Sequence, residues 1–71
     1  MMMTKEYTRT LVQYGPNAHR ALTNVIAEYE ETCELFDVSA QEISIHVHMV
    51  ADAENSMTFV ATCHLLGLEP N

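Results

Sequence analysis

Apolar residues recur at intervals of three and four positions between Asn17 and Phe36, in the stretch NAHRALTNVIAEYEETCELF. At 3.6 residues per turn this spacing gathers them on one stripe of a helix, which consists of Leu22, Val25, Ile26, Tyr29, Cys33 and Phe36. Gly15-Pro16 stops the preceding segment, Asn17 can cap the first turn, and residues 37–39 end the helix. The pattern predicts an amphipathic helix over 17–36, around which the rest of the chain is organised.

Two later segments follow a two-residue period, which is the period of a strand. In Glu42–Val50 four apolar residues alternate with three polar ones: Ile43, Ile45, Val47 and Met49 with Ser44, His46 and His48. Met57–Leu66 alternates less sharply and lies across a polar loop, ADAENS at 51–56, from the first segment. The two segments therefore predict a β-hairpin.

The apolar faces also predict the register of this hairpin, because a slip of one residue would turn one strand over. An odd-numbered loop, such as Asp52–Ser56, sets apolar residues opposite one another: Met49 and Phe59, Val47 and Ala61, Ile45 and Cys63, Ile43 and Leu65. An even-numbered loop would place polar residues opposite Ile43 and Ile45, so the odd one is favoured. All eight apolar residues then share the face that the helix stripe covers.

A first strand is predicted at Lys5–Tyr14, which is rich in Thr and Tyr and ends before Gly15-Pro16. Its inward face stays open, because two sets of residues compete for it: Thr8, Thr10, Val12 and Tyr14 against Tyr7 and Leu11. The predicted fold is α+β with the order strand-helix-strand-strand (βαββ), one helix packed on a three-stranded sheet. We expect a single small domain over 1–71 with frayed ends at 1–4 and 68–71.

An all-α fold is the alternative, because several residues suit helix ends. Residues 39–42, SAQE, match a capping box, and Gly67 followed by Pro70 suits a helix C-terminus. In that fold Cys33–Ser44 resembles the turn of helix-turn-helix DNA-binding proteins. A recognition helix over Ala40–Glu54 would carry three acidic residues and no basic one, which argues against base and phosphate contacts.

Charge is distributed unevenly along the chain, which has a net charge of -7. The three basic residues, Lys5, Arg9 and Arg20, lie in the first twenty positions, and nine acidic residues follow with no further Lys or Arg. Since nucleic-acid affinity rests mainly on cations that neutralise phosphates, we expect no direct nucleic-acid contact. A basic protein partner fits this charge better.

Cysteine use and hydropathy bear on the compartment. Cys33 and Cys63 are thirty residues apart, which is neither the spacing of a zinc knuckle nor the density of a disulfide scaffold. No apolar run is long enough to cross a membrane. We expect a cytoplasmic protein with reduced core thiols and no membrane contact.

The acidic residues of the helix are the candidate partner-binding set, namely Glu28, Glu30, Glu31, Glu34 and Asp37. Most of them crowd toward the C-terminal end of the helix, the negative end of its dipole, while His19 and Arg20 occupy the positive end. This placement works against helix stability, which hints at selection for something other than stability; a solvated acidic face is the plainer interpretation. Together with the small size, the set suggests a phage-type inhibitor or regulator of a basic nucleic-acid-processing protein.

Three histidines form the sharpest chemical feature. In the predicted register His46, His48 and His64 project from one face of two neighbouring strands. An H-x-H strand with a third histidine beside it can bind zinc with an open fourth position, and locally resembles the ligand sets of carbonic anhydrases and cupins. The alternatives are plain surface imidazoles, or a subunit interface that weakens as the imidazoles protonate in mild acid. A metal- or ligand-binding homo-oligomer is therefore the second candidate function, with zinc the one possible cofactor.

Catalysis finds little support in the sequence, and we expect no enzyme. Cys63 and His64 are strand neighbours that point to opposite faces, and the two glycines form no phosphate-binding loop. The histidine face also carries the residues Val50, Thr58, Val60, Thr62 and Leu66, a mixture typical of an interface, so a homodimer or larger oligomer is expected through it. Length and element order resemble those of dodecins, small flavin-storing oligomers, but the chain has no Trp to stack on a flavin.

Overall fold

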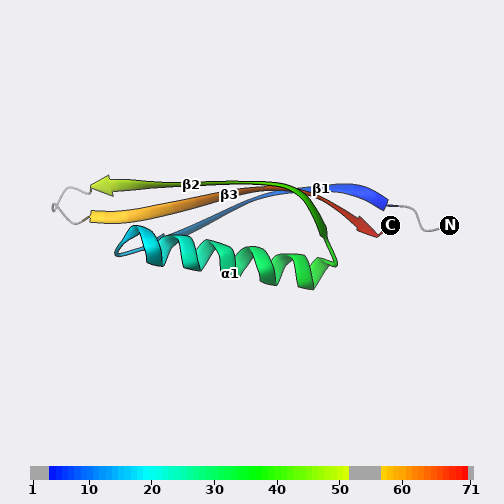
Figure 1. Cartoon of the computed structure of the whole chain (residues 1–71), viewed down its shortest axis with the longest axis horizontal. Coiled ribbons are helices and arrows are strands. Elements are labelled where there is room, and N and C mark those ends of the chain that lie inside the picture. Colours follow the sequence, from blue (N-terminus) through cyan, green and yellow to red (C-terminus); the bar gives the residue numbers. More distant parts are fainter. Residues whose placement is uncertain (1–3, 52–56, 71) are drawn as a thin grey trace.

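The computed structural model describes residues 4–51 and 57–70 of the chain. Along the chain lie strand β1 (Thr4–Gly15), helix α1 (Ala18–Phe36), strand β2 (Ser39–Ala51) and strand β3 (Met57–Pro70). The strands form one antiparallel sheet in the order β1-β3-β2, with α1 along it (Figure 1). The predicted α+β fold is confirmed. The all-α alternative is wrong, because the segment proposed as a recognition helix begins as β2.

Both ends of α1 are capped as the sequence predicts. The Asn17 side chain accepts a hydrogen bond from the Arg20 backbone N–H at 2.8 Å, which satisfies one of the free donors of the first turn. At the other end Asp37 adopts the left-handed conformation (φ 53°), which Asp tolerates better than most residues. The Val38 N–H then donates to the Cys33 carbonyl at 2.9 Å and closes the helix.

The hairpin has the predicted register. Met49 pairs with Phe59, Val47 with Ala61, Ile45 with Cys63, and Ile43 with Leu65. The connecting segment 52–56 lies outside the described residues, while the flanking pair Ala51 and Met57 is in place. A bulge between Ala40 and Glu42 marks the start of β2, where the chain comes off the helix.

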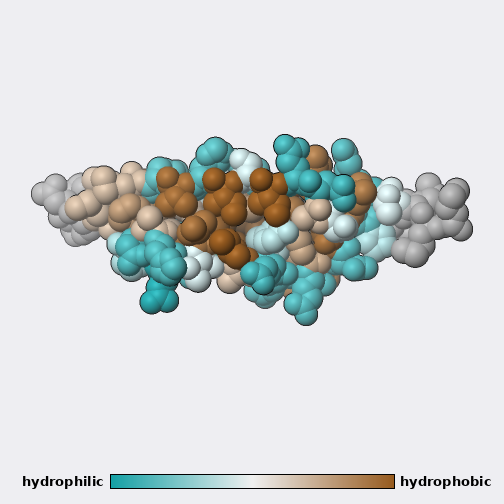
Figure 2. Space-filling view, viewed as in Figure 1, coloured by the Kyte–Doolittle hydropathy of each residue, from teal (hydrophilic) through white to brown (hydrophobic). Residues whose placement is uncertain are grey.

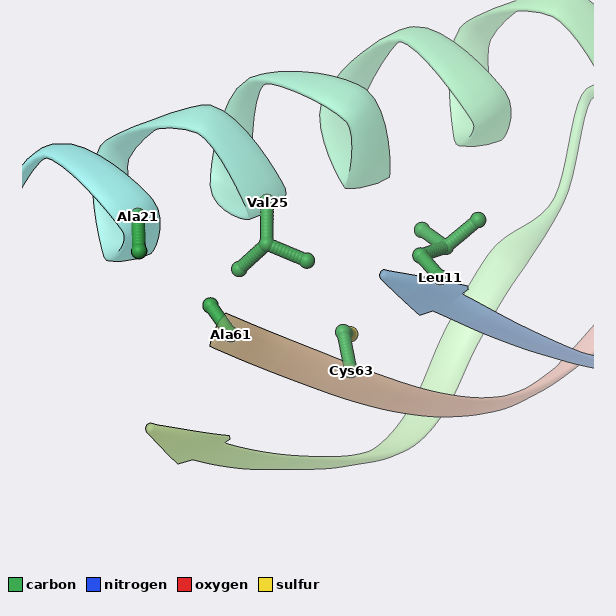
Figure 3. Close-up of a cluster of buried hydrophobic side chains, with 5 residues drawn as sticks. All are labelled: Leu11, Ala21, Val25, Ala61 and Cys63. Atoms are coloured by element: carbon green, nitrogen blue, oxygen red, sulfur yellow. The ribbon is translucent and has the colours of Figure 1, made fainter. Parts of the chain in front are cut away.

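The core lies between α1 and the two strands beneath it. Figure 3 shows Ala21 and Val25 of the helix above Leu11 of β1 and Ala61 and Cys63 of β3. Leu11 is 2% exposed, so the inward face of β1, which the sequence leaves open, is the one that includes Leu11. On the helix, Ala21 and Thr32 are buried although neither belongs to the predicted stripe, whereas Phe36 is exposed.

The ends of the chain are tied into the sheet further than the sequence suggests. Frayed ends were expected at 1–4 and 68–71, but Thr4 pairs with Pro70 and Lys5 with Glu69. Each terminal segment thus supplies the other's hydrogen-bonding partners, so Thr4 and residues 68–70 are strand. Residues 1–3 and 71 lie outside the described part.

The helix covers two strands and leaves the third bare. On β3, Ala61 and Cys63 are 0% exposed and Leu65 3%, but their partners on β2, Val47, Ile45 and Ile43, are 38%, 36% and 41% exposed. A helix about 10 Å wide spans two strands spaced about 4.8 Å apart, and here those two are β1 and β3. The expectation that all eight apolar residues of the hairpin are covered therefore holds for β3 and fails for β2.

The molecule is a narrow rod of 56 × 15 × 15 Å. Its radius of gyration is 14.6 Å, against about 11 Å for a compact domain of this length. Its accessible surface is 5096 Å², where a typical monomer of this mass exposes about 4,500 Å². Both comparisons indicate that a single copy leaves surface uncovered that proteins of this size usually bury.

Candidate protein-binding surface

The bare side of β2 and the neighbouring flank of α1 form one apolar surface on the helix side of the sheet. Its strand wall is the row Ile43, Ile45, Val47 and Met49, all at least 36% exposed. Its helix wall consists of four half-buried residues spaced by four, three and four positions: Leu22, Ile26, Tyr29 and Cys33. In Figure 2 the brown side chains run along β2 and continue onto the helix. We call these eight residues the apolar trough.

The orientation of α1 explains why its apolar flank turns toward β2. On the opposite flank, Asn24 donates to the Tyr14 carbonyl at 2.9 Å, and Glu28 accepts a hydrogen bond from Gln13. Both partners belong to β1, so that flank is held over the outer strand. Because the sheet order is β1-β3-β2, the other flank of the helix must face the β2 side.

The thiols and the phenol near the trough are packing groups. Burial raises the pKa of the Cys63 thiol, with a smaller contribution from Cys33. Burial also raises the pKa of Tyr29, which lies close to Cys33. A nucleophilic cysteine needs a lowered pKa, so the environment of Cys63 opposes nucleophilic chemistry.

The five predicted partner-binding residues do not all lie together. Glu30, Glu31 and Glu34 are exposed on α1, and exposed Asp37 follows at its C-cap. Glu28 is instead half-buried and bonded to Gln13 on the β1 side. The three exposed glutamates form what we call the acidic row.

One member of the acidic row borders the apolar trough: Glu30 follows Ile26 by one helical turn. Glu31 follows Glu28 by three residues and so lies on the flank over β1, while Glu34 lies on the helix face away from the sheet. The helix has no acidic residue in its first turn and no basic residue in its last, so its dipole adds to the negative potential at this end. The arrangement can receive a segment that is apolar on one side and basic on the other.

The three histidines lie on the sheet face away from the helix, as predicted, but they do not converge. The rings of His46 and His64 meet edge to face with centroids 6.3 Å apart. His46 also contacts the Ser44 hydroxyl at 3.1 Å, and His64 the Thr10 hydroxyl at 3.2 Å. Within the described residues no three His, Cys, Asp or Glu side chains are grouped closely enough to hold a metal ion. Zinc binding and pH-dependent assembly stay predictions.

The remaining predicted interface residues share this open face of the sheet. Thr58, Val60, Thr62 and Leu66 of β3 are half-buried and Val50 of β2 is exposed. A shallow hollow near its middle is lined by Thr8, Arg9, Thr10, Glu42, Ser44, His64, Leu65 and Leu66. The open face is thus a mixed polar and apolar surface, as predicted, and its use as an interface stays a prediction.

Sequence reasoning missed the apolar trough as a binding surface. The alternation in Glu42–Val50 correctly assigns Ile43, Ile45 and Val47 to the helix side, but it carries no information on which strand lies outermost. The sequence did contain a usable signal, because it predicts one helix and three strands, and a single helix is too narrow to cover a three-stranded sheet.

Within residues 4–51 and 57–70 no helix combines the length and the apolar character that a membrane crossing needs.

Comparison with known proteins does not assign the chain to a family. No family model matches the chain, and no curated protein or solved structure gives a significant match.

Proposed function

We propose that this chain is a non-enzymatic protein-binding module that binds a basic amphipathic helix of a partner protein in its apolar trough. The observation that carries the proposal is the exposure of Ile43, Ile45 and Val47 between 36% and 41% on the side of the sheet that the helix should bury. Grooves of this kind receive the apolar face of a helix.

Charge selects the partner. Glu30 lies beside the trough and the rest of the acidic row lies elsewhere on the same helix, while the basic side chains of the chain, Lys5, Arg9 and Arg20, lie on β1 or at the start of α1. A helix whose polar face carries Lys or Arg would be attracted to Glu30 and to the acidic surface of α1, and an acidic helix would be repelled. The net charge of -7 should also speed the association with a basic partner and slow that with an acidic one.

The narrower form of the proposal is an inhibitor or regulator, of the type that phages encode, of a basic nucleic-acid-processing protein. A partner of that class uses basic segments to contact phosphates. A basic segment held in the apolar trough beside Glu30 would no longer be free to contact phosphates. This form rests on size and charge rather than on a motif.

A synthetic helical peptide with Leu on one face and Lys on the other tests the binding mode. We expect saturable binding by fluorescence anisotropy, weakened about tenfold by Val47→Ser, since one buried apolar contact is worth about 1–1.5 kcal/mol. The matched control is Val12→Ser on the open face, because Val12 and Val47 are 41% and 38% exposed. Equal losses from both variants, or no binding at all, would sink the proposal.

The acidic row is tested with the same peptide. Glu30→Gln should weaken binding a few-fold at low salt and less at high salt, because exposed charges are screened. Glu6→Gln, an exposed residue of β1, serves as the control for the change of net charge. An effect of equal size from the control would mean that net charge alone attracts the peptide.

A further inference from the structure

The two edges of the sheet differ in how they are protected against pairing with another strand. β2 runs for 13 residues with one charged residue, Glu42, and its bulge is confined to its start at Ala40 and Glu42. β1 carries Lys5, Glu6 and Arg9 within 12 residues and lies under the helix. Charges, bulges and covering elements are the usual devices that keep an edge unpaired. Along most of β2 they are missing.

We propose that a second copy of this chain pairs along β2, joining the two sheets into one antiparallel sheet of six strands. Every residue of β2 except Ala40 is exposed, so no described element of the same chain stands in the way. The pairing would supply partners for the outward backbone groups of β2, which otherwise bond only to water.

Electrostatics permits this contact between two chains of charge -7. With α1 above β1 and β3 in each copy, the two helices would lie four strand spacings apart, roughly 19 Å. That is more than twice the screening length of about 8 Å at physiological salt. The acidic rows of the two copies would therefore repel each other weakly, which would not hold for contact through the helices.

The same spacing completes the binding site, a step that rests on the proposed function. The two apolar troughs would merge into one groove with both copies of Ile43, Ile45, Val47 and Met49 as its floor. A helix centred in this groove would lie roughly 9.5 Å from each α1, within the 8–10 Å at which helices pack. One basic helix would then lie beside Glu30 of both copies, so a single copy provides half of the site.

Two copies meeting through the open face are the competing arrangement. There Thr58, Val60 and Thr62 are already half-buried, and the middle of the face consists of His and hydroxyl side chains that bond to one another. Pairing through that face would leave the outward backbone groups of β2 bonded only to water. Pairing along β2 satisfies those groups and also brings the two apolar troughs side by side.

Hydrogen exchange across a concentration series tests the pairing, with the two edges of the sheet as mutual controls. As the mass in sedimentation rises from 8.0 kDa to twice that value, alternate amides of β2 should gain protection while the outward amides of β1 stay unprotected. A chain that stays monomeric to about 1 mM would overturn the proposal. A dimer that forms without protection of the outward β2 amides would overturn it as well.

Two lysine variants separate the edge from the open face. His48→Lys on β2 and Thr8→Lys on β1 both change exposed residues of the open face, one on each edge strand. Lysine on an edge opposes strand addition, so His48→Lys should raise the dimer Kd at least tenfold and Thr8→Lys should leave it unchanged. Equal weakening by both variants would assign the dimer to the open face and overturn the proposal.

Peptide stoichiometry distinguishes a failure of the pairing from a failure of the proposed function. One Leu/Lys peptide per two chains supports the shared groove. One peptide per monomeric chain overturns the shared groove and leaves the protein-binding function intact. No peptide bound by a dimer with protected β2 amides supports the pairing and removes the proposed function.

Discussion

The strands β1 and β2 occupy equivalent positions at the two edges of one sheet, yet they differ in burial. Cys63 of β3 pairs with Leu11 on one side and with Ile45 on the other. Leu11 is 2% exposed and Ile45 is 36% exposed. The two residues face the same side of the sheet and are of similar size, so the position of the helix alone makes the difference.

The short connection between β1 and α1 explains where the helix lies. Only Pro16 and Asn17 separate the two elements, and a Cβ on Gly15 would come within 2.5 Å of the Ala21 backbone nitrogen. Glycine therefore permits the first turn of the helix to pack directly on the end of β1. Further along, the contacts to Tyr14 and Gln13 keep the helix on this side of the sheet.

The largest expected effect comes from shortening one side chain on the helix side of each edge strand and comparing the two losses of stability. Leu11→Ala should destabilise the fold by about 2–5 kcal/mol, because it leaves a cavity beneath the helix, whereas Ile45→Ala should cost about 1 kcal/mol or less. Urea unfolding at a concentration where the chain is monomeric measures both. Similar losses would show that β2 is covered in solution even in a single copy.

The second largest loss of stability is expected at Gly15, in the connection between β1 and α1. Gly15→Ala should cost about 1–3 kcal/mol, because the added methyl group meets backbone atoms of Arg20 and Ala21 that cannot rotate away. Gly67→Ala should cost a similar amount, since the added methyl group would meet the buried Val38 side chain and would come within 2.8 Å of the Ser39 carbonyl oxygen. Thermal unfolding of both variants ranks them. A harmless Gly15→Ala would mean that the helix is not held on β1 by this close approach.

Alkaline pH should destabilise the fold through Cys63, which lies on the central strand β3. Burial raises the pKa of Cys63 above its ordinary value of 9.0, so above about pH 9 the unfolded thiol ionises before the folded one. The unfolded state then binds fewer protons, and stability falls as the pH rises through this range.

Unfolding midpoints measured against pH check this prediction, and Cys63→Ala should remove part of the decline. Burial also raises the pKa of Tyr29, so a residual decline at higher pH is expected in that variant. An unchanged profile in Cys63→Ala would show that the thiol reaches solvent past the uncovered β2.

The smallest effect concerns the charges of the protected edge. Lys5 Nζ lies 3.5 Å from Glu69 Oε1, with the two side chains 58% and 20% exposed. Lys5→Ala should therefore lower the free energy of unfolding by no more than about 1 kcal/mol. It should also leave the dimer Kd unchanged while Arg9 and Glu6 remain. A larger loss in urea unfolding would indicate that the end of β1 depends on this ion pair.

The sequence determined the local elements, because their signals are local. The stripe of α1, the caps at Asn17 and Asp37 and the alternation in β2 each depend on residues a few positions apart. The hairpin register also followed, since one slip would have exposed Cys63 and Leu65 and buried histidines. The histidines and the acidic residues were assigned to their elements for the same reason.

Tertiary structure decided which of these residues share a surface. The inward face of β1 became that of Leu11 only once β3 lay between β1 and β2. Glu28 lies apart from the other predicted partner-binding residues, because its side chain bonds to Gln13 of β1. The rings of His46 and His64 contact each other, and His48 is not part of that contact.

The apolar trough depends on the same non-local choice. Strand order and helix placement are set by packing between segments far apart in the chain, and a pattern with a period of two or 3.6 residues carries no information about them. The sequence therefore specified an apolar face on β2, and the packing of α1 over β1 and β3 left that face uncovered.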